Sequence, residues 1–332
     1  HFLKTCLLAI KETLLKRFCW KNNSFSMKRS ASVLRIIKNR QYAWKRERSS
    51  SAGSSTVDYC INLVKKYDYE NYLCNLLLPQ EARVSSFAIR SFNVETAQVG
   101  ESVTEKQTAL MRMQFWSDAI EKIYKDAPPQ TPVALELWRA VQKHKLSKRW
   151  LNRILEERKK NLENPSNKTI EEVEKYSENT VSSINYLLLE SIGVKDLTAD
   201  HAASHLGKCQ GIVTLLRAVP HHAQRRRTFL PQQTLIQHSV AEEEVFRGCK
   251  EKKMLDVIYD IASVANSHLE KARSMKKDVP KSTHKVFLPA GAMEQYLLGL
   301  QKVDFNVYHS SLQQRNNWLP WTLWKKKIMG GF

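Results

Sequence analysis

The sequence predicts an all-α fold, a bundle of about eight to twelve helices. Three observations carry this prediction. Apolar residues recur three or four positions apart in segment after segment beyond Asp58, and that spacing is the helical period. Alternating apolar and polar runs flanked by hairpin turns are scarce. Hydrophobic residues make up 42% of the 332 positions, which is enough to bury a substantial core.

Helical periodicity places five helices along the body of the chain. Each has apolar residues at a spacing that brings them onto one face of a helix. In chain order, these residues are Ala109, Met113, Trp116, Ile120 and Ile123; Leu135, Trp138 and Val141; Trp150, Ile154 and Leu155; Ile184, Leu187, Leu188 and Ile192; and Leu255, Ile258, Ile261, Ala262, Ala265 and Leu269. Pro128 and Pro129 should end the first helix, and Gly193 is placed to cap the fourth.

Residues 1–57 differ from the rest of the chain in composition. They carry 13 Lys and Arg but only two acids, Glu12 and Glu47, so they hold +11 of the total formal charge of +20. A basic, Ser-rich and acid-poor segment is typical of a mitochondrial presequence. A nucleic-acid-binding arm and translated sequence upstream of the natural start are the alternatives. We therefore divide the chain into a disordered, presequence-like segment, 1–57, and a helical domain, 58–332.

Several common functional signatures are missing from the sequence. There is no P-loop, GxGxxG, GxSxG or HExxH motif, and the six cysteines form no CxxC pair. No apolar run approaches the roughly 18 residues that a membrane-spanning helix needs. The helical domain has a net charge of +9 with 31 acids interspersed, which argues against nucleic acid as a partner.

Two stretches carry a family resemblance. The first is FAIRSFNVE at residues 87–95; the second is HLGKCQGIVTLLRAVP at residues 205–220, followed by RRRTFLP at residues 225–231. In this order they resemble the two motifs of the squalene/phytoene synthase family, over about residues 58–300. The resemblance implies an isoprenoid-synthase-like helical bundle around a central cavity. In that family, aspartates four residues apart on two facing helices hold magnesium ions, which bridge to the substrate diphosphate.

The sequence departs from the family pattern at the metal-binding positions. Alignment on Arg90 puts Asn93 and Ala97 where the first aspartate pair belongs, and alignment on Arg217 puts Ala218 and His222 where the second belongs. Magnesium requires hard oxygen ligands, mainly carboxylates, and these four side chains offer none. The resemblance therefore implies a pseudo-enzyme with no catalytic, cofactor-binding or metal-binding residue. The altered motif positions that we expect to line the cavity are Arg90, Asn93, Ala97, Thr214, Arg217, Ala218 and His222.

Further segments resemble one branch of the family, the mitochondrial complex I assembly factor 6 branch. They are MRMQFW at 111–116, DHAASH at 200–205, VIYDIA at 257–262, VDF at 303–305 and SLQQ at 311–314. This resemblance implies a non-catalytic protein that acts early in building respiratory complex I and is linked to its ND1 membrane subunit. The implied partners are complex I subunits or other assembly factors, with peripheral contact to the matrix side of the inner membrane. An isoprenoid or another lipid is the ligand that its cavity would take.

The alternative function is an active or lipid-binding prenyl-diphosphate transferase of the same family, with atypical ligands. A separate expectation concerns residues 318–327, where Trp318, Trp321 and Trp324 precede three lysines. Tryptophan and lysine suit the interface of an anionic membrane. A frayed terminus or a contact with a protein partner would explain the same residues.

Overall fold

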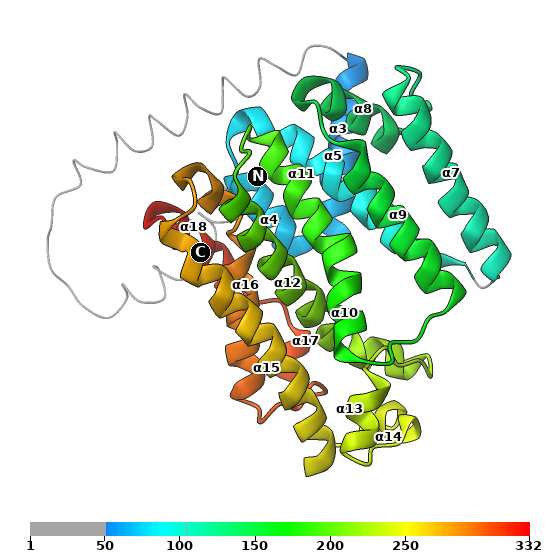
Figure 1. Ribbon diagram of the computed structural model, residues 1–332, viewed down its shortest axis with the longest axis vertical. Coiled ribbons are helices and arrows are strands. Elements are labelled where there is room, and N and C mark those ends of the chain that lie inside the picture. The colour runs from blue at the N-terminus through cyan, green and yellow to red at the C-terminus, as the bar shows by residue number, and fades with distance from the viewer. Residues whose placement is uncertain (1–50, 104) are drawn as a thin grey trace, which may run out of the picture. The chain divides into compact units, whose positions relative to one another are not determined.

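Helix α12, Leu197–Gln224, is the longest helix and runs through the middle of the bundle (Figure 1). Helix α15, Lys252–Ser274, packs along it, and α10, α11 and α16 also contact it. The computed structural model describes residues 51–103 and 105–332, with side chains from residue 56 onward. Residues Thr56–Phe332 form one compact unit.

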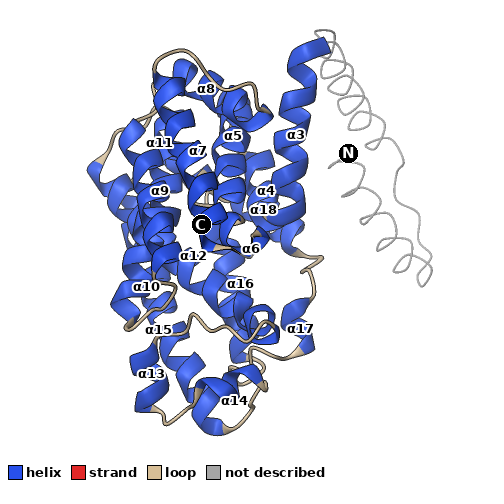
Figure 2. Cartoon of the chain, turned by 90° about the vertical axis from the view of Figure 1, so that its right-hand side faces the viewer, coloured by secondary structure: helices blue, strands red, loops and turns tan. Residues whose placement is uncertain are grey.

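The described residues form helices and connecting loops only, with no strand among them (Figure 2). The prediction of an all-α fold is confirmed. In chain order, the other helices are α3 Ser51–Tyr67, α4 Tyr69–Leu77, α5 Gln80–Ala97, α6 Val99–Ser102, α7 Lys106–Tyr124, α8 Pro132–His144, α9 Lys148–Glu163, α10 Ile170–Ser177, α11 Ser183–Ser191, α13 Gln232–Gln237, α14 Glu242–Phe246, α16 Pro289–Gln301, α17 Ser310–Gln313 and α18 Leu319–Ile328. A π-helical turn, η1 Glu178–Ser182, joins α10 to α11, and two 3-10 turns, η2 Met275–Lys277 and η3 Lys281–Lys285, follow α15.

The helix count in the described residues exceeds the predicted eight to twelve, because α3 through α18 make sixteen α-helices. Four of them, α6, α13, α14 and α17, have six residues or fewer. Segments this short do not repeat an apolar stripe, so periodicity cannot detect them.

The N-terminal boundary also differs from the prediction. Residues 1–50 of the predicted disordered segment lie outside the described residues, whereas residues 51–57 begin α3. Cys60 and Val64 are buried farther along α3. Burial of those two side chains fixes the helix, and Ser and Ala are acceptable within its first turns.

Helix α12 approaches its neighbours closely at two glycines. A Cβ atom on Gly207 would lie 2.6 Å from the backbone N and Cα of Ser182, in η1. A Cβ atom on Gly211 would overlap the side chain of Ser177, at the end of α10. The two glycines therefore let α12 pack against the α10–η1 backbone at a distance that other residues would prevent.

None of the helices formed by the described residues has the length and apolar character required to cross a membrane.

Candidate functional site: a polar cavity beside α12

A cavity of about 830 Å³ lies beside α12. Its walls come from α4, α12 and α16, and residues 311–319 close one side. The volume falls within the range of small-molecule sites, about 300–1,000 Å³. The lining is rich in charged and amide side chains, however, unlike the mostly apolar lining of such sites.

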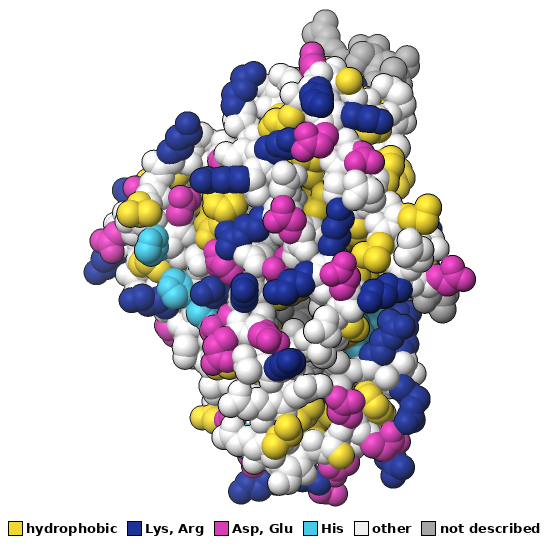
Figure 3. All heavy atoms as spheres, turned by 45° about the vertical axis from the view of Figure 1, so that its right-hand side comes forward, with side chains coloured by type: hydrophobic (Ala, Val, Ile, Leu, Met, Phe, Trp, Pro, Cys, Tyr) yellow, Lys and Arg dark blue, Asp and Glu magenta, His cyan; other side chains and the backbone are white. Residues whose placement is uncertain are grey.

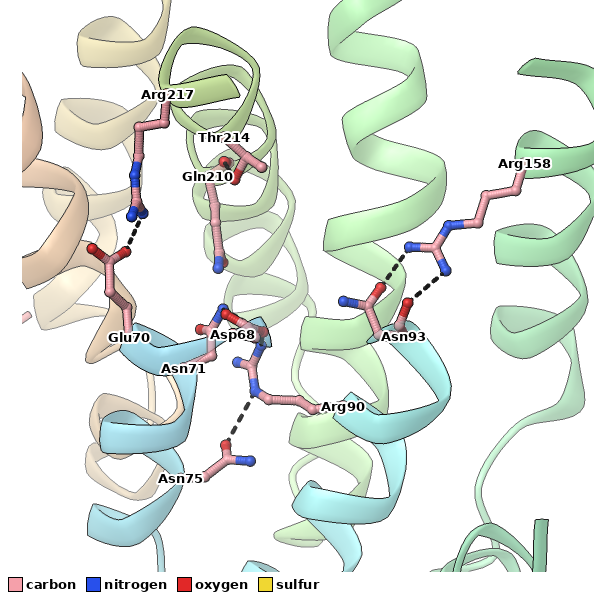
Figure 4. A network of polar contacts seen from close by, with 10 residues as sticks. All are labelled: Asp68, Glu70, Asn71, Asn75, Arg90, Asn93, Arg158, Gln210, Thr214 and Arg217. Atoms are coloured by element: carbon pink, nitrogen blue, oxygen red, sulfur yellow. Dashed lines mark hydrogen bonds and ion pairs between the residues drawn. The ribbon is translucent and has the colours of Figure 1, made fainter. Parts of the chain in front are cut away.

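An ion pair joins the two principal walls of the cavity (Figure 4). Arg217 Nη1, on α12, donates to Glu70 Oε2, on α4, at 2.6 Å. Burial raises the pKa of the Glu70 carboxyl, and the Arg217 guanidinium opposes that shift. The ring of Tyr296, on α16, lies 5.8 Å from the same guanidinium. Arg217 is therefore held between an acid and an aromatic ring, both supplied by this chain.

Arg90 lies deeper than the cavity and does not line it. Its side chain is 3% exposed, and its Nε donates to Asn75 Oδ1 at 3.1 Å. Asp68, on the cavity wall, approaches the Arg90 guanidinium at 3.8 Å. Burial lowers the pKa of Arg90, while Asp68 favours its charged form. This pair connects the middle of α5 to the cavity wall.

Asn93, on α5, is hydrogen-bonded to a residue of α9 rather than to a cavity residue. Arg158, on α9, is 7% exposed; its Nη2 donates to Asn93 Oδ1 at 2.7 Å and its Nη1 to the Asn93 carbonyl at 3.0 Å (Figure 4). Nη1 also donates to Thr96 Oγ1. Burial lowers the pKa of Arg158. The amide of Asn93 therefore faces a buried cation.

The seven residues singled out from the sequence do not form one site. Thr214, Arg217 and Ala218 line the cavity, and the other four are not among its lining residues. Ala97 is exposed near the end of α5. His222 packs edge-on against Phe229, with ring centroids 4.7 Å apart, and burial lowers its pKa.

Sequence reasoning missed the wall contributed by α4. Asp68, Glu70 and Asn71 all line the cavity. Asn71 Oδ1, on this wall, and Gln210 Oε1, on α12, are buried with no hydrogen-bond partner in the described structure. No motif marks the α4 residues, because their role depends on where α4 packs.

The residues that line the cavity do not fit a magnesium–diphosphate cluster. Its carboxylates are Asp68 and Glu70, and each already faces a guanidinium, Arg90 and Arg217 respectively. A cation beside each carboxylate opposes the binding of a second cation there. In the part of the chain described, one group of three residues is close enough to share a metal ion, Glu244, Cys249 and Glu251, and none of them lines the cavity.

The surface charge is mixed rather than segregated. On the face in Figure 3, Lys and Arg side chains alternate with Asp and Glu side chains over most of the area. Nucleic-acid-binding domains gather their positive charge on one face or stripe. This face offers no such stripe.

Comparison with known proteins identifies the family of this chain. The sequence profile of squalene/phytoene synthase matches residues 64–324. The human protein named NADH dehydrogenase (ubiquinone) complex I, assembly factor 6 is 54% identical over 275 residues, or 82% of this chain and 83% of that protein. The 15-cis-phytoene synthase of Synechococcus elongatus is 20% identical over 60% of this chain and 69% of its own length.

Solved structures share the same fold. A dehydrosqualene synthase in complex with ligand superimposes with a TM-score of 0.74 over 83% of this chain and 96% of its own, at 15% identity. Both resemblances seen in the sequence are thereby confirmed. The chain belongs to the squalene/phytoene synthase family, on the branch that contains the complex I assembly factor 6 proteins.

Proposed function

We propose that this protein is a non-catalytic assembly factor for mitochondrial respiratory complex I. The observation that carries the proposal is the contrast in similarity: 54% identity to a relative named as an assembly factor, against 20% to a relative named as a synthase. The alternative, an active prenyl-diphosphate transferase, rests on the more distant relationship alone.

The geometry around Asn93 and Arg217 supports a role without metal catalysis. We interpret Asn93, Ala97, Ala218 and His222 as the positions of the family's four metal-binding aspartates, and Arg90, Thr214 and Arg217 as the residues beside them. Arg158 donates to Asn93, so under this interpretation a buried positive charge lies beside one of the four altered positions. Such a charge disfavours magnesium at that position.

We further propose that the protein works early in assembly, on the matrix side of the inner membrane, in the biogenesis of the ND1 subunit. Residues 1–57 would direct its import into mitochondria. Deletion of residues 1–50 from the full chain should abolish import into isolated, energised mitochondria. A deleted chain that still enters the matrix and becomes protease-protected would contradict the presequence assignment.

A ligand is proposed for the cavity as well. The ligand would be an isoprenoid or another lipid whose polar head group occupies this cavity of about 830 Å³, because the unpartnered amide oxygens of Asn71 and Gln210 can accept hydrogen bonds from such a head group. Native mass spectrometry of the protein purified from mitochondria tests this directly. Loss of an added mass when Gln210→Leu is introduced would support a ligand in the cavity, whereas a mass equal to that of the bare chain would exclude one.

The function itself is tested by rescue. Cells that lack their own assembly factor 6 protein would receive the full chain, and native gels would measure mature complex I and ND1-containing intermediates. We expect complex I to return, and crosslinking to recover ND1 with the chain. A mitochondrial-targeted phytoene synthase is the matched control and should not rescue. Failure of the full chain to rescue, at normal abundance in the matrix, would contradict the proposal.

A further inference from the structure

Helix α18 is fixed to the bundle along one face. Leu319 and Leu323 are buried on that face, against α4 and α16. Lys326 Nζ lies 3.1 Å from Glu294 Oε2, and Gln295 Nε2 donates to Thr322 Oγ1 at 2.8 Å. Because these contacts recur about every turn, α18 is a packed element and not a frayed end.

The opposite face of α18 exposes large apolar side chains. Trp318, Trp321 and Trp324 are 65%, 51% and 44% exposed, and the rings of Trp321 and Trp324 stack with centroids 5.0 Å apart. Ile328 and Met329 extend the same apolar surface. We call this set, with Lys325, the outer α18 face. Contiguous exposed apolar surface rimmed by polar residues marks an interaction site.

The charged side chains of residues 305–332 are all basic. They are Arg315 and Lys325–Lys327, and no Asp or Glu follows Asp304. Glu294, on α16, is bound to Lys326 and Arg273 on the inner side. The outer α18 face therefore combines exposed tryptophans with an exposed lysine, Lys325.

We infer that the outer α18 face docks onto the surface of an anionic lipid bilayer. Tryptophan lies at the head-group level of membranes, and lysine beside it binds lipid phosphates. Protein interfaces, by contrast, are depleted in lysine. The inference rests on the proposed function, whose membrane contact it assigns to specific residues. Since Trp318 and Leu319 also line the cavity, docking would bring one rim of the cavity to the lipid surface.

The first test measures partitioning of the full chain into phosphatidylcholine vesicles with and without phosphatidylglycerol. We expect binding only to the anionic vesicles. Trp321→Ser with Trp324→Ser should lower the partition coefficient about tenfold, and Lys325→Gln about fivefold. The matched control is Met111→Ser with Phe115→Ser, which removes two exposed apolar side chains from α7 and should change binding less than twofold. Melting temperatures establish that every variant folds.

The second test locates the contact. In a full chain carrying Trp20→Phe and Trp44→Phe, brominated anionic lipid should quench tryptophan fluorescence, because bromine quenches only rings that it contacts. Replacement of Trp318, Trp321 and Trp324 by Phe should abolish this quenching, since the remaining tryptophans lie on other helices.

Unchanged partitioning or persistent quenching in these variants would overturn the inference. A variant of the outer α18 face that binds vesicles normally but no longer rescues complex I would also overturn the inference, because the face would then contact a protein partner. Rescue by the unmodified chain tests the proposed function independently of both results.

Discussion

At the scale of single residues, Arg158 has the most unusual environment. It is buried, and it donates to the Asn93 side chain, the Asn93 carbonyl and Thr96 Oγ1. A buried cation is costly unless its donors are satisfied, and Arg158 Nε has no partner among the described residues. The forked guanidinium is what allows two hydrogen bonds to Asn93, which a lysine cannot reproduce.

Arg158→Met should destabilise the fold by about 2 kcal/mol, because it removes the donor of the hydrogen bonds to Asn93 Oδ1 and Thr96 Oγ1. Arg158→Lys should recover little of this loss. Urea unfolding of the full chain measures the change, with Lys160→Met as an exposed control on the same helix. An equal loss in both Met variants would mean that the hydrogen bonds of Arg158 contribute nothing specific.

A second residue-scale feature is the histidine pair between α12 and α15. His205 Nδ1 lies 2.8 Å from His268 Nδ1, and His268 Nε2 donates to Glu174 Oε1 at 2.6 Å. Burial lowers the pKa of His205; His268, Lys208 and Lys271 lower it further, and Glu178 partly offsets them. The folded protein therefore favours neutral His205.

This shift has a consequence for stability. Unfolded His205 gains a proton as the pH falls below its ordinary pKa of about 6.5, while folded His205 resists it until lower pH. The free energy of unfolding should therefore decrease as the pH falls through this window. His205→Gln should show a shallower decrease in urea unfolding measured across the same pH range. Parallel curves for the two proteins would show that His205 does not contribute to the dependence.

At the scale of helices, periodicity predicted the buried face correctly where the apolar residues repeat regularly over several turns. The five apolar residues predicted for α7 are all buried, and Gly193 has the positive φ of +74° expected for a helix cap. In α8 the prediction was only partly right: Val141 is buried, but Val133, Leu137 and Ala140 fill the core in place of Leu135 and Trp138. Trp138 instead turns outward and donates to Asp126. Three apolar residues at helical spacing were therefore too few to identify the buried face of α8.

The close packing of α12 gives an element-scale prediction. Gly211→Ala should cost roughly 1–3 kcal/mol, because its Cβ overlaps the Ser177 side chain. Ser177→Gly should remove most of that cost in the double variant, measured as a coupling energy in urea unfolding. At Gly207 the Ser182 backbone, as well as the Ser182 hydroxyl, obstructs the Cβ, so Ser182→Gly should not relieve Gly207→Ala. If the serine-to-glycine substitution restored stability to both glycine variants, or to neither, this packing would be contradicted.

At the scale of the whole molecule, local motifs identified the family but not the cavity wall. The resemblance depended on residues 87–95 and 205–231, and the structure puts only the α12 part of these in the cavity lining. The α4 wall and the Tyr296 ring come from segments distant in sequence. Their positions depend on how α4 packs against α5, α16 and α18, and α16 against α12, which neither periodicity nor spacing encodes. The ion pair between Glu70 and Arg217 could therefore not have been predicted.

The central claim is that the family fold persists here without its metal-dependent chemistry. The most direct test incubates the purified full chain with farnesyl or geranylgeranyl diphosphate and magnesium, beside an active phytoene synthase. We expect no condensation product above the protein-free background, because the cavity carboxylates are paired with arginines and metal-assisted charge stabilisation supplies most of such a rate. Product that forms in proportion to the chain and disappears with EDTA would contradict the claim.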